Sequence, residues 1–157
     1  MTSPRPAFRR LAAASIAWML VAAAAAATGD APSAPTPAQA AASTRERAIF
    51  AVSDADPQKW NLTLGNIANA IDGFGTSGVE IELVVYGPGI AMLRKDSPVA
   101  AKLAMALKSG VRIAACQNSM RGFNLQATDL VPGAEPVPSG VVELIRRQHA
   151  GYAYVRS

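Results

Sequence analysis

Cys116 is the only cysteine of this 157-residue chain, and it stands where a predicted strand gives way to a polar segment. The segment from Val111 to Ala115, apolar except for Arg112, is typical of a short interior strand. Gln117, Asn118 and Ser119 follow the cysteine and break this run. We therefore expect the thiol at the carboxyl edge of a sheet, where α/β folds bind ligands, and beside a helix start, which favours the thiolate.

The expected chemistry is that of an accessible thiol with a lowered pKa. Amides at the helix start would hydrogen-bond a thiolate or the outer sulfur of a persulfide. The turn Gly87-Pro88-Gly89 follows another predicted strand and would bring further backbone amides to the same edge. The pocket residues predicted around Cys116 are therefore Gly87, Gly89, Gln117, Asn118 and Ser119.

A structural role for the cysteine stays open at this point. One cysteine excludes an internal disulfide, and a free thiol also serves as a small buried hydrophobe. In that case the protein would be a non-catalytic binding or oligomeric module. Cys116 would then pack in the core, and Gly87 to Gly89 with Asn118 would form a ligand pocket or a subunit contact.

Other catalytic or metal-binding signals are weak. His149 is the only histidine and follows Arg146 and Arg147 near the end of a predicted helix, where a solvated residue is the simplest interpretation. The sequence leaves open a catalytic pair of Cys116 and His149 that come together only in the folded protein. The chain has no G-x-S-x-G, no metal-spaced Cys/His cluster and no Walker motif, and no carboxylate pair stands out. We therefore predict no metal and no cofactor.

The first 44 residues are predicted to lie outside the folded domain. Arg5, Arg9 and Arg10 precede the uncharged stretch from Leu11 to Ala27, which ends in an alanine run suited to cleavage. This pattern predicts a signal peptide over residues 1–27 and export, to the periplasm of a bacterium, with no stable membrane span after cleavage. An uncleaved anchor is the alternative, and the Sec and twin-arginine routes both stay open. Residues 28–44 read as an Ala/Pro-rich disordered tether.

The remaining residues, 45–157, are predicted to form one α/β domain. Three of the 15 Lys and Arg residues precede Thr28, so 12 remain against 11 Asp and Glu. No basic cluster exceeds two residues, which gives no electrostatic support for nucleic-acid binding. This thin polar covering predicts instead that the domain self-associates, with the contact beside Cys116.

Strand and helix patterns alternate along this domain. Strands are predicted over 48–52, 79–86, 111–115 and 152–156, with a short extended piece at 135–138. Helices are predicted to begin at Pro57, near Ser97-Pro98 and at Ser139, with short helical pieces over 90–93 and near 120–125. In the last long helix Val141, Val142, Leu144 and Ile145 are expected to face inward. This alternation implies a parallel sheet with helices on both faces.

Several segments resemble the DsrE/DsrF-like family of small α/β proteins. They are Asn66 to Asn69, Val79 to Gly89, Gly110 to Met120 with its Cys-x-Asn-Ser-Met pattern, Val137 to Leu144, and Gln148-x-x-Gly151-Tyr152-x-Tyr154. Their order and spacing extend over nearly the whole of residues 48–156.

The resemblance implies a three-layer α/β/α fold around a mostly parallel five-stranded sheet, assembled into homo- or hetero-oligomers. Some members of the family carry sulfur as a persulfide on a cysteine. Cys116 is the only residue here that matches such a role, and it would need a sulfur-donor or acceptor protein as partner. A predicted export signal sets this chain apart from the cytoplasmic sulfur carriers of the family.

Overall fold

The computed structural model describes residues 45–156. The predicted signal peptide (1–27) and tether (28–44) lie outside the described residues. Strands and helices alternate as expected. In chain order they are β1 (Glu46–Val52), α1 (Pro57–Phe74), β2 (Val79–Val85), the 3₁₀ helix η1 (Gly87–Leu93), α2 (Ala100–Lys108), β3 (Arg112–Cys116), α3 (Gln117–Gly122), the 3₁₀ helix η2 (Ala127–Asp129), β4 (Ala134–Val137), α4 (Gly140–His149) and β5 (Ala153–Val155).

The five strands form one parallel sheet in the order β4-β3-β2-β1-β5. The predicted three-layer α/β/α fold is thus confirmed. The extended piece predicted at 135–138 joins the sheet as β4, pairing Cys116 with Val137. Both edge strands are short: β4 has four residues and β5 has three.

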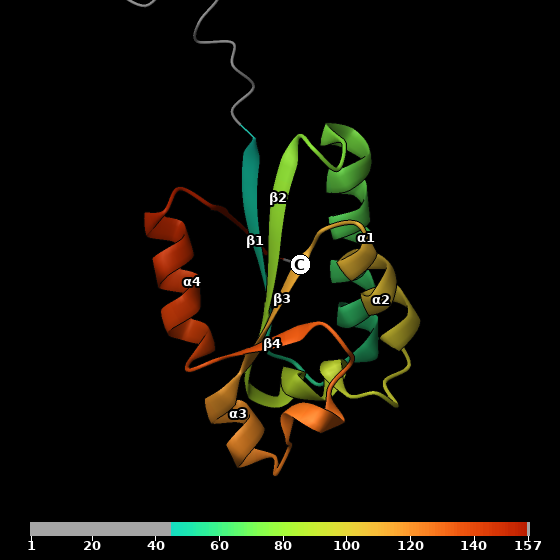
Figure 1. Ribbon diagram of the computed structural model, residues 1–157, viewed down its shortest axis with the longest axis vertical. Helices are drawn as coiled ribbons and strands as arrows, with labels where there is room; N and C mark the ends of the chain where they lie inside the picture. Colours follow the sequence, from blue (N-terminus) through green and yellow to red (C-terminus); the bar gives the residue numbers. More distant parts are fainter. Residues whose placement is uncertain (1–44, 157) are drawn as a thin grey trace, which may run out of the picture. The chain divides into compact units, whose positions relative to one another are not determined.

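Helices cover the two faces of the sheet unequally (Figure 1). On one face α1 and α2 pack over the larger apolar core, which includes Phe50, Leu83 and Ile113. On the other face α4 covers a small cluster made of Ile49, Val84, Ala114, Leu144 and Tyr152. The short helix α3 lies beyond the carboxyl end of β3. Because the sheet is parallel, all carboxyl ends lie at the same edge. Within residues 45–156, α4 is the only helix over the second face (Figure 1).

Local sequence explains the helix that closes the first face. The Asp56 side chain caps α1 by accepting a hydrogen bond from the Gln58 amide at 2.8 Å, and Pro57 occupies the first turn. The helix ends at Gly75, whose φ of 76° is a conformation that glycine adopts readily. Trp60 is buried, and its indole Nε1 donates to the Asp54 carbonyl oxygen at 2.7 Å.

The outward face of α4 differs from the prediction. Only Leu144 of the four expected apolar residues is buried, whereas Val141, Val142 and Ile145 are each about half exposed. Gly140, Leu144 and Arg147 share the stripe that faces the sheet, so the other apolar residues point away from it.

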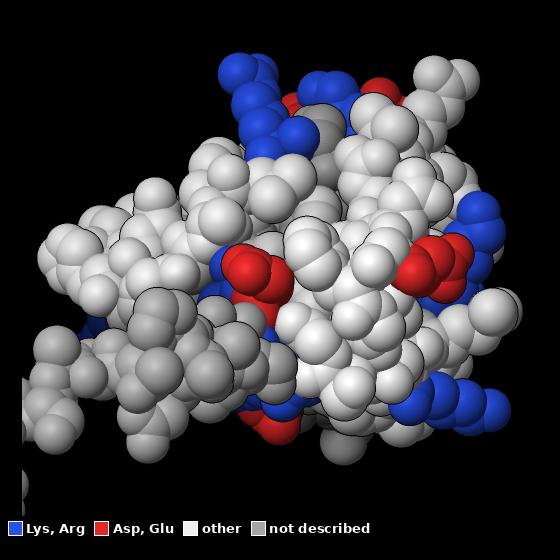
Figure 2. Space-filling model, turned by 90° about the horizontal axis from the view of Figure 1, so that it is seen from above, with Lys and Arg blue, Asp and Glu red and all other residues white. Residues whose placement is uncertain are grey.

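Seen from the end at which the strands begin, charged side chains are scattered and most of the surface is uncharged (Figure 2). No helix within residues 45–156 has the length and apolar character needed to cross a bilayer.

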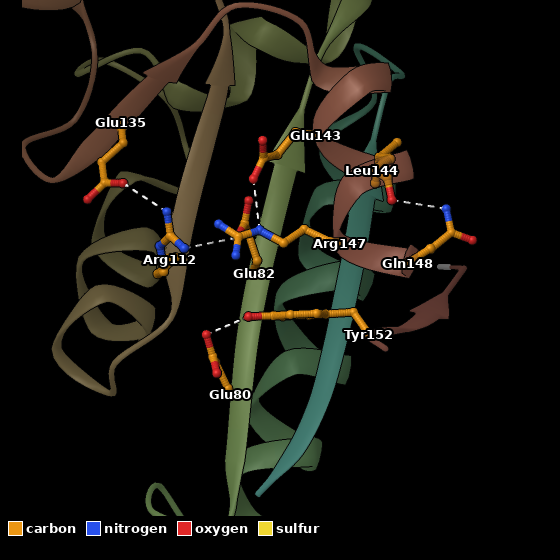
Figure 3. A network of polar contacts seen from close by, with 9 residues as sticks. All are labelled: Glu80, Glu82, Arg112, Glu135, Glu143, Leu144, Arg147, Gln148 and Tyr152. Atoms are coloured by element: carbon orange, nitrogen blue, oxygen red, sulfur yellow. Dashed lines mark hydrogen bonds and ion pairs between the residues drawn. The ribbon is translucent and has the colours of Figure 1, made fainter. Parts of the chain in front are cut away.

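A cluster of charges lies between α4 and the sheet (Figure 3). Glu82 on β2 is 1% exposed. The Nε atom of Arg147 lies 2.8 Å from a Glu82 oxygen and 2.8 Å from a Glu143 oxygen. Its single N–H donates to Glu143, and neither Glu82 oxygen accepts a hydrogen bond. Arg112 lies 3.5 Å from the same Glu82 carboxylate. Glu82 therefore has two cations near it but no donor of its own.

Burial raises the pKa of Glu82 to about 7, although Arg147 and Arg112 oppose this shift. Glu143 raises the pKa further, both by its charge and because a protonated Glu82 can hydrogen-bond to it. The neutral acid is thus the form that suits this position. The sequence signal for it was a second glutamate after Glu80, lying deeper in the strand Val79–Val85, whose other residues are all apolar.

We predict that Glu82 makes the protein less stable as pH rises. The folded state binds this proton more tightly than the unfolded chain, so the free energy of unfolding should fall between about pH 4.5 and pH 7 and then level off. Relative to Glu82→Gln, the wild-type protein should lose up to about 3 kcal/mol over this range. Urea unfolding at a series of pH values measures the difference. Glu135→Gln, an exposed acid on β4, is the control, and parallel curves for wild type and Glu82→Gln would contradict the prediction.

Candidate functional site

The structure places Cys116 at the end of β3, where it is also the residue that precedes the first turn of α3. The predicted strand-to-helix junction is therefore correct. The residue is only 4% exposed, however, so the expectation of an accessible thiol is wrong. The reason is its face of the sheet. Cys116 follows Arg112 and Ala114 at alternate positions, and Ala114 belongs to the cluster under α4.

The sulfur is surrounded by hydrogen-bond donors. The Ser119 hydroxyl and the backbone amides of Asn118, Ser119 and Gly140 lie close enough to lower its pKa, although the Cys116 side chain does not cap α3 with a hydrogen bond. Two of these amides belong to α3, and the third is the first residue of α4. Cys116 belongs to neither apolar cluster of the described residues.

These donors set the ionisation of the thiol. Burial raises the pKa of Cys116, but the hydrogen bonds from Ser119, Gly140 and Asn118 together lower it by more. The pKa therefore lies below that of an ordinary cysteine, in the direction expected from the sequence. Hydrogen bonds to a thiolate are strong because the acceptor carries a full charge. The site is a buried thiol built to hold negative charge.

Ser119 connects the thiol to the turn after β2. Its Oγ accepts a hydrogen bond from the Gly87 amide at 2.7 Å, which leaves its own proton directed to the sulfur. Gly87 has a φ of 54°, a conformation that disfavours side chains and fits a glycine here. Two predicted pocket residues, Gly87 and Ser119, thus act together on Cys116.

Gly140 is the functional residue that the sequence analysis missed. A Cβ atom at this position would lie 2.8 Å from the Cβ of Tyr86, at the end of β2. Only glycine allows α4 to begin so close to the sheet, and this approach brings its amide to the sulfur. The sequence held a signal that could have pointed to this residue, because Gly140 is the first residue of a helix that follows an edge strand. In a parallel sheet such a helix begins at the same edge as Cys116.

The remaining predicted pocket residues have other places. Gly89 packs against the end of β1, with its amide donating to the Ser53 carbonyl at 2.9 Å. The Asn118 side chain accepts from Arg121 and only its backbone reaches the thiol. Gln117 lines an open hollow of about 570 Å³ next to the site, together with Met120, Arg121, Asn124, Leu125, Gln126, Ala127 and Pro136.

No second catalytic group meets the thiol among the described residues. His149 is exposed at the far end of α4, about 13 Å along the helix axis from the Gly140 amide that contacts the sulfur. A Cys–His pair is therefore excluded in this arrangement. Residues 45–156 also contain no group of His, Cys, Asp and Glu side chains able to hold a metal ion.

Comparison with known families gives one match, to the DsrE/DsrF-like family over residues 46–156. The chain belongs to the DsrE/DsrF-like family. The match extends from β1 to the end of β5 and so includes every residue of the site. Membership points to a role related to sulfur relay. A comparison with curated proteins found no match.

Solved structures of similar proteins share the fold. A protein of unknown function from Methanobacterium thermoautotrophicum, MTH1491, is 33% identical, with a TM-score of 0.68 over 71% of this chain and 99% of its own. BT1422 from Bacteroides thetaiotaomicron, a conserved protein of unknown function, is 18% identical with a TM-score of 0.60, over 74% and 99% of the two chains. The ychN protein of E. coli is 15% identical, also at 0.60, over 71% and 99%.

We predict that Ser119→Ala raises the pKa of Cys116, because the thiolate loses its hydroxyl donor. The Gly87 amide also loses its acceptor, which should cost about 1–2 kcal/mol of stability. Titration of the thiolate absorbance near 240 nm measures the pKa, with Cys116→Ser as the blank. Ser139→Ala is the matched control, because this side chain precedes Gly140 yet makes no capping bond. An unchanged titration in Ser119→Ala would show that the hydroxyl does not act on the sulfur.

Proposed function

We propose that this protein carries sulfur as a persulfide on Cys116, or exchanges thiols through it. The observation that supports the proposal is the position of Cys116, a buried thiol at the junction of β3 and α3 whose pKa is lowered by Ser119 and by nearby backbone amides. A cysteine that merely fills space needs no hydrogen bonds, whereas a thiolate or persulfide anion needs donors when it is buried. Membership of the DsrE/DsrF-like family supports the same reading.

The proposed loading step is a simple displacement. The Cys116 thiolate attacks the outer sulfur of a donor persulfide, R–S–SH. The S–S bond of the donor breaks as a new one forms on Cys116, and the donor leaves as a thiolate. An acceptor thiolate then takes the outer sulfur by the same step in reverse, and Cys116 leaves. No outside oxidant or reductant is needed.

The lowered pKa suits both halves of this cycle. It increases the fraction of Cys116 that is ionised and ready to attack, and it makes Cys116 a better leaving group when sulfur is passed on. No acid or base is required from the protein, since thiolates enter and leave. The hollow beside Gln117 and Arg121 offers room for the donor or acceptor to approach.

The proposed place of action is outside the cytoplasm, in the periplasm of a bacterium. This part of the proposal rests on the basic and apolar pattern of residues 1–27 alone. A sulfur-donor or acceptor protein there would be the partner.

Incubation of the purified protein with glutathione persulfide should add one sulfur atom, about 32 Da, to Cys116. Intact-mass and peptide mass spectrometry measure the addition, and cyanide or dithiothreitol should remove it. Loading should be lost in Cys116→Ser and in wild-type protein alkylated beforehand. Ser139→Ala, next to the site, should load like wild type. A wild-type protein that takes up no sulfur would refute the proposal.

Burial of Cys116 favours one second candidate, a binding or oligomeric module in which the thiol is structural. The two differ in the consequence of Cys116→Ala. For a structural cysteine this change costs stability and nothing else. For a carrier it abolishes loading even when the protein stays folded. Circular dichroism and the mass assay on the same sample separate the two outcomes.

Self-association is the second part of the proposal, and the apolar outer face of α4 supports it. Val141, Val142 and Ile145 are exposed on this helix, and Tyr154 is exposed on neighbouring β5. Tyr154 pairs with Ile49 of β1, so it points to the same side of the sheet as α4. A single helix leaves this face incompletely covered, and a second copy would bury the exposed side chains.

We predict that Ile145→Lys with Val141→Lys converts the domain to a monomer. Charges on the outer stripe of α4 would have to be buried without partners, which opposes association. Size-exclusion chromatography with light scattering on residues 28–157 measures the mass. Met105→Lys is the control, since Met105 is 67% exposed on α2, on the other face. A wild-type domain that is monomeric at micromolar concentration, or a double variant that still associates, would count against this surface.

A further inference from the structure

The buried thiol raises the question of how any reagent reaches it. Cys116 is 4% exposed and lies on the face of the sheet that α4 covers. Gly140, the first residue of α4, has its amide near enough to the sulfur to lower the pKa of the thiol. Movement of α4 away from the sheet would therefore uncover the thiol and remove one of its donors at once.

The charge cluster is the other attachment of α4 to the sheet. Glu143 and Arg147 are three and seven residues beyond Gly140, so they lie on the same stripe of the helix. Both meet Glu82 in the middle of β2 (Figure 3). The helix is thus held to the sheet at its start by the close approach of Gly140, and further along by Glu82.

We propose that Glu82 is a positioning residue, whose ionisation loosens α4 and so opens the way to Cys116. A neutral Glu82 can donate its proton to Glu143, which in turn accepts from Arg147, and the cluster then holds one carboxylate beside Arg147 rather than two. An ionised Glu82 faces Glu143 as a second carboxylate and competes for one N–H that is already used. The ionised cluster gains solvent for its unpaired oxygens when the helix lifts.

Other charged groups around Glu82 do not complete the pairing. Arg112 of β3 lies 3.5 Å from Glu82 and also 3.4 Å from Glu135 of β4, so it is shared. On β2 itself, Glu80 accepts a hydrogen bond from Tyr152. The Tyr152 ring has Arg47 of β1 and Arg147 near its face, at 5.7 and 5.4 Å from its centre. Arg147 is thus the only α4 cation that faces Glu82 within the described residues.

Linkage gives the size and direction of the effect. If Glu82 titrates near 7 with α4 closed and near its ordinary value of 4.5 when α4 is open, opening becomes about tenfold more favourable per pH unit between these values. Above pH 7 the effect is constant. Ionisation of the thiol contributes to the rate in wild type and in Glu82→Gln alike, so comparing the two proteins isolates the effect of Glu82.

The test measures alkylation of Cys116 by iodoacetamide from pH 5 to pH 9, without any sulfur donor. In wild-type protein the logarithm of the rate should rise more steeply with pH than in Glu82→Gln up to about pH 7, and in parallel with it above that pH. In Glu82→Gln only the ionisation of the thiol should contribute to the rise. At pH 8 this variant should react at least tenfold more slowly than wild type. Hydrogen exchange of the α4 amides should show the same loss of pH dependence.

Glu135→Gln is the matched control, because it neutralises an exposed acid that contacts Arg112 but not α4. It should follow the wild-type profile. Equal slopes and rates for wild type and Glu82→Gln would overturn the proposal. It rests on Cys116 being the group that reacts in the proposed function, but the readouts are independent. If the protein takes up no sulfur but the wild type still shows the steeper rise, the role of Glu82 stands and the carrier function is refuted. If the protein takes up sulfur but wild type and Glu82→Gln show equal profiles, the carrier function stands and the role of Glu82 is refuted.

Discussion

The close approach of the first residue of α4 to the ends of β2 and β3 is the constraint on which the site depends. Gly140 has no side chain, and this alone lets the helix begin against Tyr86. The same approach supplies an amide to Cys116 and closes the thiol from solvent. Polarity and burial of the sulfur are therefore two results of one contact. A larger residue at Gly140 would alter both together.

The second face of the sheet combines few apolar contacts with costly buried charges. Its cluster has five buried residues, far fewer than the core beneath α1 and α2. Glu82 lies in this thin layer without a donor for its carboxylate. Buried ions of this kind seldom add stability compared with apolar residues of similar size. Low local stability is typical of segments that move during function, and α4 rests on a small apolar cluster beside a buried carboxylate that lacks a donor.

Sequence reasoning predicted what depends on local pattern and strand order. Strand β3 is apolar after Arg112, so its junction with the polar Gln117 could be placed, and with it Cys116. What could not be predicted depends on how two elements meet. Gly140 matters because Tyr86 is opposite, and Glu82 because Arg147 and Glu143 come from a helix about 60 residues away. The burial of Cys116 was missed because alternation does not say which face lies under α4. Likewise, the sequence of an apolar helix stripe such as Val141 and Ile145 does not tell whether the stripe packs against the core of its own domain or against a partner molecule.

The two short edge strands have a consequence for how readily the protein aggregates through the edges of its sheet. Pro136 lies in β4, where it offers no N–H group at a free edge, and β5 pairs through only three residues. Neither edge is a good template for adding a strand from another molecule. Uncontrolled growth of the sheet into fibrils is thereby discouraged, even though the neighbouring helix exposes apolar side chains. Contacts between molecules are steered toward side-chain packing, which is reversible and can be selective.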